Sequence, residues 1–167
     1  MNVVWDELAA GFPQAEAMVR LSVRLIVAMI FGAVIGMQRE RAGKPAGLRT
    51  HMMVALGAAV FVIASGEFGM NPDSISRVIQ GLVTGIGFLG AGAILKLYDR
   101  RAVEGLTTAA GIWMTAALGV AVGLGRFGLA LVATLLAWMT LSLVRQLEHI
   151  LNRGNRKSED DTISSED

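Results

Sequence analysis

The stretch VIQGLVTGIGFLGAGAIL (residues 78–95) decides the fold class, because it holds no charged residue along its whole length. A helix rises 1.5 Å per residue, so this stretch nearly crosses a hydrocarbon core of about 30 Å. Backbone amides without partners are very unfavourable in lipid, and a helix is therefore expected despite the many glycines. We interpret the stretch as a membrane-spanning helix.

The composition of the whole chain supports a membrane protein. Hydrophobic residues make up 53% of the 167 residues, charged residues only 17%, and the mean hydropathy is +0.54. A water-soluble protein of this size could not hide so much apolar surface in one core. The net charge of +1 gives no basic field for nucleic acid, and the absence of cysteine excludes disulfides and thiolate metal sites.

Polar breaks divide the chain into five apolar stretches, which predict an all-α polytopic bundle of about five transmembrane helices. The expected spans are residues 18–37, 51–65, 78–95, 106–124 and 127–144. The segment before them, residues 1–17, is expected to be extracytoplasmic. Residues 18–146 form the expected membrane domain, and the polar, acidic end of the chain, residues 147–167, is expected to be a disordered cytoplasmic tail.

The basic residues predict the orientation of the bundle. Lysine and arginine gather after the first, third and fifth spans, whereas the alternate segments are acidic or carry a single arginine. Basic loops remain in the cytoplasm, so the N-terminus is predicted outside and the C-terminus inside. The expected location is therefore a membrane, with the lipid bilayer as the surrounding partner.

The glycines of the third span match the G-x-G-x-x-G spacing of dinucleotide sites, but the strand, the helix and the distant acidic residue that such a site requires are absent from their surroundings. Close helix packing explains them better. A helix so thin could also be locally broken and line a binding site, as in some transporters. The predicted packing residues are Gly81, Gly85, Gly87, Gly90, Ala91 and Gly92, with Gly105, Thr107 and Thr108 at the start of the next span.

Ionisable and polar residues within the spans are few. Arg24 lies in the first span, where it either extends outward to the interface or pairs with Glu67 or Asp73 of the second loop. A possible polar or ionic cluster comprises Arg24, Asp73, Arg77, Gln80 and Thr84. No relay of carboxylates is visible within the spans, which disfavours a proton- or cation-coupled pump.

The first cytoplasmic loop, residues 38–50, carries the densest polar signal. Its basic side chains surround a turn fixed by proline and glycine, and they could bind lipid head groups, a phosphate or an acidic partner. They could equally be ordinary membrane anchors. The two histidines, His51 and His149, are isolated, and no nucleophile lies at a suitable spacing from a base. We therefore expect no catalytic residue, metal site, cofactor or enzyme activity.

Three blocks in order resemble the hydrophobic domain of the MgtC/SapB family of bacterial inner-membrane proteins. They are GAVIGMQRERAGKPAGLRTHMMVALGA (32–58), SRVIQGLVTGIGFLGAGAIL (76–95) and GLTTAAGIWMTAALGVAVGLG (105–125). The resemblance implies a bundle of about five helices and a link to adaptation to low magnesium. It also implies action through other membrane proteins, the ATP synthase among them, rather than carriage of magnesium.

The same resemblance assigns particular residues to family motifs. The signature loop, which would bind a partner or lipid, corresponds to Arg39, Glu40, Lys44, Pro45, Gly47, Arg49, Thr50 and His51. Asp73 and Arg77 resemble the family's acidic-to-arginine element, although NPDSISR matches it only with a shift of one residue. The long members carry a soluble C-terminal domain that this sequence lacks, so their virulence role does not transfer by resemblance.

The sequence thus leads to two functional hypotheses. The first is a non-enzymatic modulator of other membrane proteins, linked to magnesium adaptation. The alternative is a small ion transporter or channel built around the glycine-rich third helix. The small residues on the spans also suggest a homo-oligomer.

Overall fold

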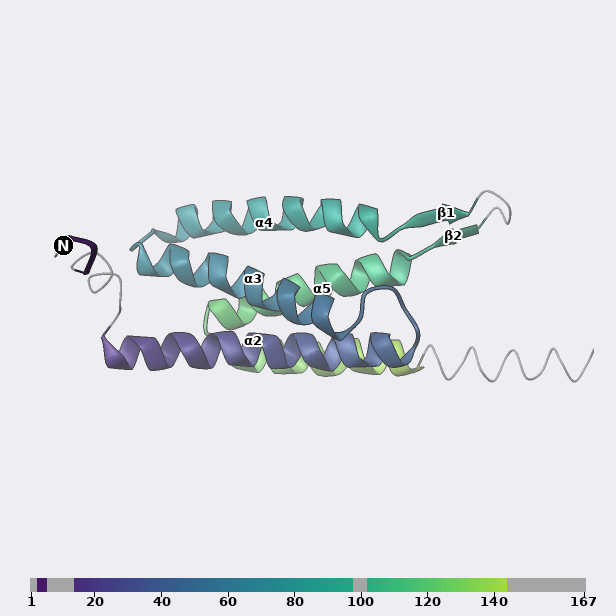
Figure 1. The fold of residues 1–167 in the computed structure, drawn as a ribbon, viewed down its shortest axis with the longest axis horizontal. Helices are drawn as coiled ribbons and strands as arrows, with labels where there is room; N and C mark the ends of the chain where they lie inside the picture. The colour runs from purple at the N-terminus through teal and green to yellow at the C-terminus, as the bar shows by residue number, and fades with distance from the viewer. Residues whose placement is uncertain (1–2, 6–13, 98–101, 144–167) are drawn as a thin grey trace, which may run out of the picture.

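The computed structural model describes residues 3–5, 14–97 and 102–143. Its helices are α2 (Ala15–Arg41), α3 (Leu48–Glu67), α4 (Pro72–Gly92), α5 (Leu106–Gly123) and the Phe127–Leu143 helix. They run up and down along one common direction (Figure 1). Within the described part of the chain, the first four are long and apolar enough to cross a membrane, and the fifth is apolar but shorter. The predicted all-α polytopic bundle is confirmed.

The ends of the helices follow from local chemistry. The side chain of Asn71 caps α4 by accepting a hydrogen bond from the Ser74 backbone N–H at 2.9 Å, and Pro72 occupies the first helical position. Helix α5 begins after Gly105 and ends before Gly125, both of which have positive φ angles that favour glycine. A side chain on Gly105 would also collide with the carbonyl of Ala93.

The predicted third span is only partly right at its C-terminal end. Helix α4 stops at Gly92, and the chain continues into a two-stranded antiparallel hairpin made of β1 (Leu95–Leu97) and β2 (Ala102–Glu104). The apolar residues 93–95 made the span seem to end three residues later than the helix does, whereas the helix begins six residues before the predicted span. The hairpin extends past the end of the bundle where the 42–47 loop also lies (Figure 1).

The two ends of the bundle differ in charge, as the sequence predicted. The loop between α2 and α3, the hairpin and the end of the Phe127–Leu143 helix share one end, and the start of α4 lies at the other (Figure 1). Each of these three segments belongs to a basic region of the sequence. Basic loops stay cytoplasmic, so this common end is the cytoplasmic one. The predicted tail, residues 147–167, and most of residues 1–17 lie outside the described residues.

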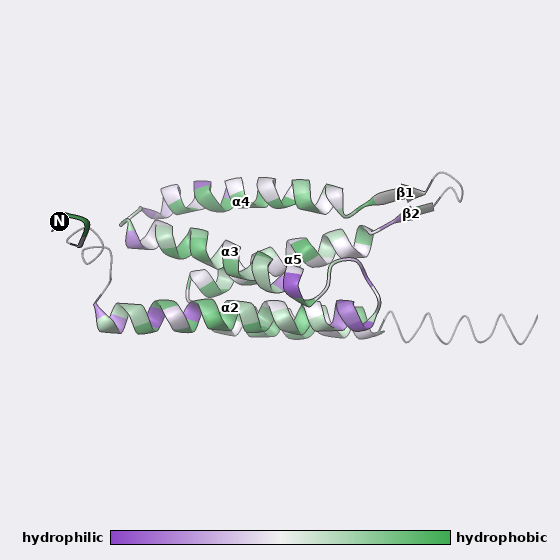
Figure 2. Cartoon of the chain, in the orientation of Figure 1, coloured by the Kyte–Doolittle hydropathy of each residue, from purple (hydrophilic) through white to green (hydrophobic). Residues whose placement is uncertain are grey.

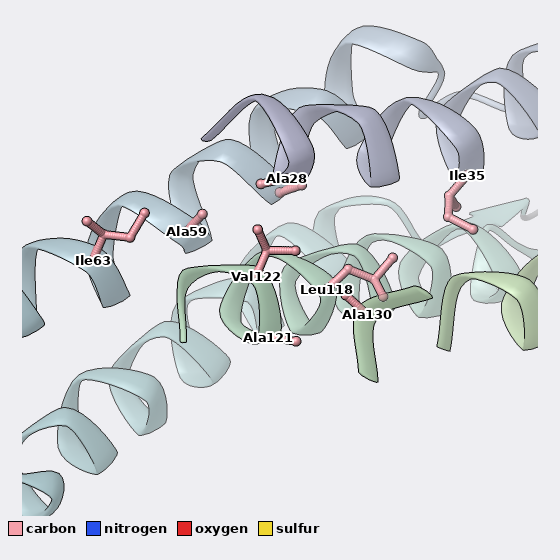
Figure 3. Packing of buried hydrophobic residues seen from close by; sticks show 9 residues of the cluster. Ala28, Ile35, Ala59, Ile63, Leu118, Ala121, Val122 and Ala130 are labelled. Atoms are coloured by element: carbon pink, nitrogen blue, oxygen red, sulfur yellow. The ribbon is translucent and has the colours of Figure 1, made fainter. Parts of the chain in front are cut away.

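The core is formed by α2, α3, α5 and the Phe127–Leu143 helix. Figure 3 shows how alanines and a few branched side chains from these helices meet. Apolar attraction between helices is weak in lipid, so close van der Waals contact between small residues has to hold them together. The buried cluster comprises Ala28, Ile35, Ala55, Ala59, Ile63, Leu118, Ala121, Val122 and Ala130.

Helix α4 contributes no buried residue, although it is one continuous helix from Pro72 to Gly92. It stands beside α3 and α5, and polar residues interrupt its apolar colour in Figure 2. An apolar groove of about 640 Å³ separates it from α3. The groove is lined by Met53, Val54, Gly57, Ala58, Phe61, Val78, Gly81, Leu82, Gly85, Ile86 and Leu89.

Candidate functional site: a buried polar cluster and an exposed basic loop

Apart from Gly105, whose added Cβ would collide with the Ala93 carbonyl, the closest helix contacts lie at glycines outside the predicted set. An added Cβ on Gly32 of α2 would lie 2.6 Å from the His51 backbone oxygen, and one on Gly36 would lie 2.8 Å from the Cα of Leu48. On α5, a Cβ on Gly119 would collide with the carbonyl of Ala55. Helix α3 thus packs closely between α2 and α5. Only glycine fits at the points where α2 and α5 cross it.

The predicted packing residues of α4 make few contacts inside the chain. An added Cβ at Gly81, Gly85, Gly87 or Gly92 would meet nothing within 4 Å, whereas one at Gly90 would lie 3.7 Å from the Ala109 Cβ. Ala91 is exposed. Packing against another helix of the same chain is therefore confined to Gly90. Packing against a helix of another molecule stays a prediction.

Two residues of the predicted signature loop are buried inside the bundle. Arg39 is 4% exposed and His51 is fully buried. The Arg39 guanidinium donates a hydrogen bond from Nη2 to the Thr108 hydroxyl, 2.7 Å away. The structure thus places Arg39 and His51 inside the bundle against α5, whereas their neighbours Arg41, Arg49 and Thr50 face outward.

The orientation of the His51 ring follows from the hydrogen bonds of Thr115. The single hydroxyl proton of Thr115 goes to the carbonyl of Gly111, 2.9 Å away. The 3.1 Å contact between Thr115 Oγ1 and His51 Nδ1 must then be donated by the ring. Glycine at position 111 makes room for the imidazole, since an added Cβ would lie only 3.5 Å from Cε1. The His51 ring thus ties α3 to α5.

Two atoms of this buried polar cluster (Arg39, His51, Thr108 and Thr115) have no hydrogen-bond partner among the described residues. They are Arg39 Nε and His51 Nε2. A buried polar atom without a partner destabilises a fold by about 1–3 kcal/mol. Every described carboxylate is exposed, and none lies within 4.0 Å of Arg39. The interior of the cytoplasmic half of the bundle is therefore positively charged.

Glu40 points back to the start of α3. Its Oε2 accepts a hydrogen bond from the Leu48 backbone N–H at 2.7 Å, and Gly47 leaves room for the carboxylate. The negative charge also suits the positive end of the helix dipole. Glu40 acts as a cap from a distant position, which the sequence spacing did not reveal.

Removing this cap gives a testable result. Replacement of Glu40 by alanine should lower the free energy of unfolding by about 1 kcal/mol, as loss of an N-cap usually does. Reversible unfolding in mixed detergent micelles measures this change. Replacement by glutamine should retain part of the stability, because the amide oxygen still accepts. Equal losses for the two variants would contradict a capping role.

The remaining loop residues face outward. Lys44, Pro45, Arg49 and Thr50 are exposed, and so is Arg41 beside them. We call Arg41, Lys44 and Arg49 the basic loop patch. It is the part of the predicted loop that is accessible to a partner or to lipid head groups.

Arg24 has a partner that the sequence did not indicate. Its Nη1 donates a hydrogen bond to the carbonyl of Gly123, 3.0 Å away, at the C-terminal end of α5. A cation at this position satisfies an open carbonyl and the negative end of the helix dipole. Arg24 therefore does not join Asp73, Arg77, Gln80 and Thr84, all of which are exposed on α4. Thr107 is also exposed, in contrast to its buried neighbour Thr108.

Comparison with known proteins matches the sequence model of the MgtC family to residues 25–150. SrpB of Synechococcus elongatus is 44% identical over 161 residues, which cover 90% of this chain and 85% of SrpB. MgtC of Salmonella typhimurium (strain LT2) is 43% identical, over 78% of this chain and 55% of MgtC. YhiD of Escherichia coli (strain K12), provisionally named a magnesium transporter, is 39% identical, over 80% of this chain and 64% of YhiD. No solved structure matches.

Proposed function

Because this chain belongs to the MgtC family, we propose that it is a non-enzymatic modulator of other inner-membrane proteins and acts in adaptation to low magnesium. The chain is a multi-pass inner-membrane protein. It spans little more than half the length of MgtC and 85% of SrpB. A role in magnesium adaptation rests on the family resemblance and on the name of YhiD.

The buried cation Arg39 is the main observation that favours a modulator over a cation carrier. A hydrated Mg²⁺ ion requires oxygen ligands, and carboxylates above all. The polar interior of the described bundle instead offers a guanidinium, an imidazole, four hydroxyls and the amide oxygen of Gln38, but no carboxylate. A positive interior repels a divalent cation. The groove beside α4 is lined by apolar side chains and glycines, which supply no ligand either.

The basic loop patch is the surface that we assign to the partner. Three cations within nine residues are exposed at the cytoplasmic end, where an acidic surface of another membrane protein could meet them. The family resemblance makes the ATP synthase the first partner to test. Arg39 and His51 support this patch from inside the fold, and Glu40 caps α3 beside it.

A charge-reversal variant tests the partner surface. With Arg41, Lys44 and Arg49 all replaced by glutamate, co-purification with the partner from magnesium-limited cells should fall about tenfold or more, since like charges across an interface are strongly unfavourable. Quantitative mass spectrometry of proteins cross-linked in native membranes measures the loss. Arg126→Glu, at the opposite end of the bundle and exposed, is the matched control. Unchanged partner recovery with the triple variant would overturn the proposal.

The transporter hypothesis gives a different result in a second assay. Purified protein in liposomes should show no Mg²⁺, K⁺ or proton flux above that of empty vesicles. Flux that disappears when Gly87 is replaced by leucine would instead assign transport to α4.

A further inference from the structure

The outward face of α4 is polar at a depth where it should meet lipid. The apolar residues Ile79, Leu82 and Ile86 are partly buried against the rest of the bundle. The exposed residues Asp73, Arg77, Gln80 and Thr84 follow one another at spacings of four, three and four. That spacing places them along one stripe of a helix. We call these four residues the α4 polar stripe.

Two members of the α4 polar stripe lie deep in the membrane. Helix α4 starts at Pro72, so Gln80 lies about 12 Å and Thr84 about 18 Å along the helix axis. Both depths fall within a hydrocarbon core of about 30 Å. Lipid chains offer no hydrogen-bond partner at such depths.

The chain itself leaves the stripe unsatisfied. The Thr84 hydroxyl donates to the backbone oxygen of Gln80, 2.9 Å away, and its own oxygen stays free to accept. Among the described residues, the Gln80 amide forms no hydrogen bond, and neither Asp73 nor Arg77 forms an ion pair. A partner for the Gln80 amide must therefore come from another molecule, whereas Asp73 and Arg77 lie within about 8 Å of the start of α4 and are closer to the head groups.

The next residues along the stripe permit a close approach. Gly87 and Ala91 continue it toward the cytoplasm, and an added Cβ at Gly87 would meet nothing in the chain. A second helix could thus lie against α4 at short distance, with its backbone near these small residues. The polar groups give a second helix a reason to bind here, and the small residues allow its backbone to come close. The two features together indicate an interface on this face.

We infer that α4 packs against α4 of a second copy of this chain, around a twofold axis along the membrane normal. A twofold interface joins the same patch on both subunits, so the patch must be complementary to itself. The Gln80 amide is both donor and acceptor and pairs with its own copy. Asp73 and Arg77, one turn apart, supply opposite charges that meet across the axis. The dimer stands independently of the modulator proposal, since it concerns a different surface.

Cysteine cross-linking tests the interface directly, because the sequence holds no cysteine. Single substitutions are placed along α4 in the full chain, and the purified proteins are oxidised in liposomes. Arg77→Cys, Gln80→Cys, Thr84→Cys and Gly87→Cys should form disulfide-linked dimers. Ile79→Cys, Leu82→Cys and Ile86→Cys should not, because these positions face the bundle. Equal yields at all positions, or a maximum on the bundle side, would overturn the dimer.

A second substitution tests the role of the polar stripe. In the Gly87→Cys background, Gln80→Leu should reduce the rate of dimer cross-linking about tenfold, within the range that interhelical hydrogen bonds provide. Thr140→Leu is the control, since Thr140 is an exposed polar residue of the Phe127–Leu143 helix and lies outside α4. No change with Gln80→Leu, or a change as large with Thr140→Leu, would overturn the inference.

The charged pair and the native membrane complete the test. Asp73→Arg and Arg77→Asp should each weaken dimerisation, and the double exchange should restore it. Failure of the double variant to recover, while it still inserts and folds, counts against the twofold pairing. Cross-linking of Gly87→Cys in native membranes to a protein of another mass, in place of the dimer, would assign the face to a foreign partner and also overturn the inference.

Discussion

Replacement of Gly119 by leucine should leave little folded protein. Gly119 lies where α5 crosses α3, and its added Cβ would collide with the carbonyl of Ala55 and lie 2.8 Å from the Ala58 Cβ. Neither neighbour is the flexible end of a long side chain, so the helices themselves must separate. Overpacking by one or two methylenes typically destabilises by about 1–3 kcal/mol, and leucine adds four carbons. Size-exclusion chromatography of a fluorescent fusion in mild detergent measures the folded fraction.

The matched control for this substitution is Gly57→Leu on α3. Gly57 also lies in the membrane part of the bundle, but an added Cβ there meets nothing within 4 Å and enters the groove beside α4. The folded fraction should stay near that of the natural sequence. A loss as large as that of Gly119→Leu would show that any glycine substitution disrupts insertion, and the close helix crossing would not be the cause.

Replacement of His51 by alanine should be the most destabilising change in the signature loop. The imidazole is fully buried between α2, α3 and α5, and its Nδ1–H is bonded to Thr115. The variant leaves a cavity and an unpaired hydroxyl oxygen, so the free energy of unfolding should fall by about 3 kcal/mol. Reversible unfolding in mixed micelles measures the change.

The neighbouring residue supplies the control for this prediction. Thr50 is exposed beside His51, and Thr50→Ala should change the free energy of unfolding by no more than about 0.5 kcal/mol. If His51→Ala were equally mild and instead lost only partner binding, the imidazole would belong to the partner surface. His51 would then bind the partner together with the rest of the signature loop, as the sequence predicted.

The contrast between Arg39 and Arg49 shows that the burial of a basic side chain could not be predicted from the sequence. Both are basic residues of one short segment, and composition placed both in a surface loop. Burial depends on which face of a helix meets α5, and that contact joins residues 69 positions apart. The five spans and their orientation needed only local apolarity and charge. The buried polar cluster required the relative rotation of three helices, which no local pattern specifies.

The glycines also show that local spacing does not determine which helix faces pack together. Gly32 and Gly36 are four residues apart, as are Gly81 and Gly85, so the spacing alone favours neither pair. Only the first pair is enclosed by α3. Small residues four positions apart identify a helix face that another helix can approach closely. Which helix packs there depends on how the other helices of the bundle are arranged. Gly105 is different, since a positive φ at a helix start is a local requirement.

The unequal lengths of α2 and α5 have a consequence for how the bundle lies in the membrane. The 18 residues of α5 give it a length of about 27 Å, whereas the 27 residues of α2 extend about 40 Å. Both helices serve one hydrocarbon core of about 30 Å. Helix α2 must tilt or project into the head groups. Helix α5 is the most buried of the four long helices, so its shortfall is covered mainly by the neighbouring helices rather than by lipid.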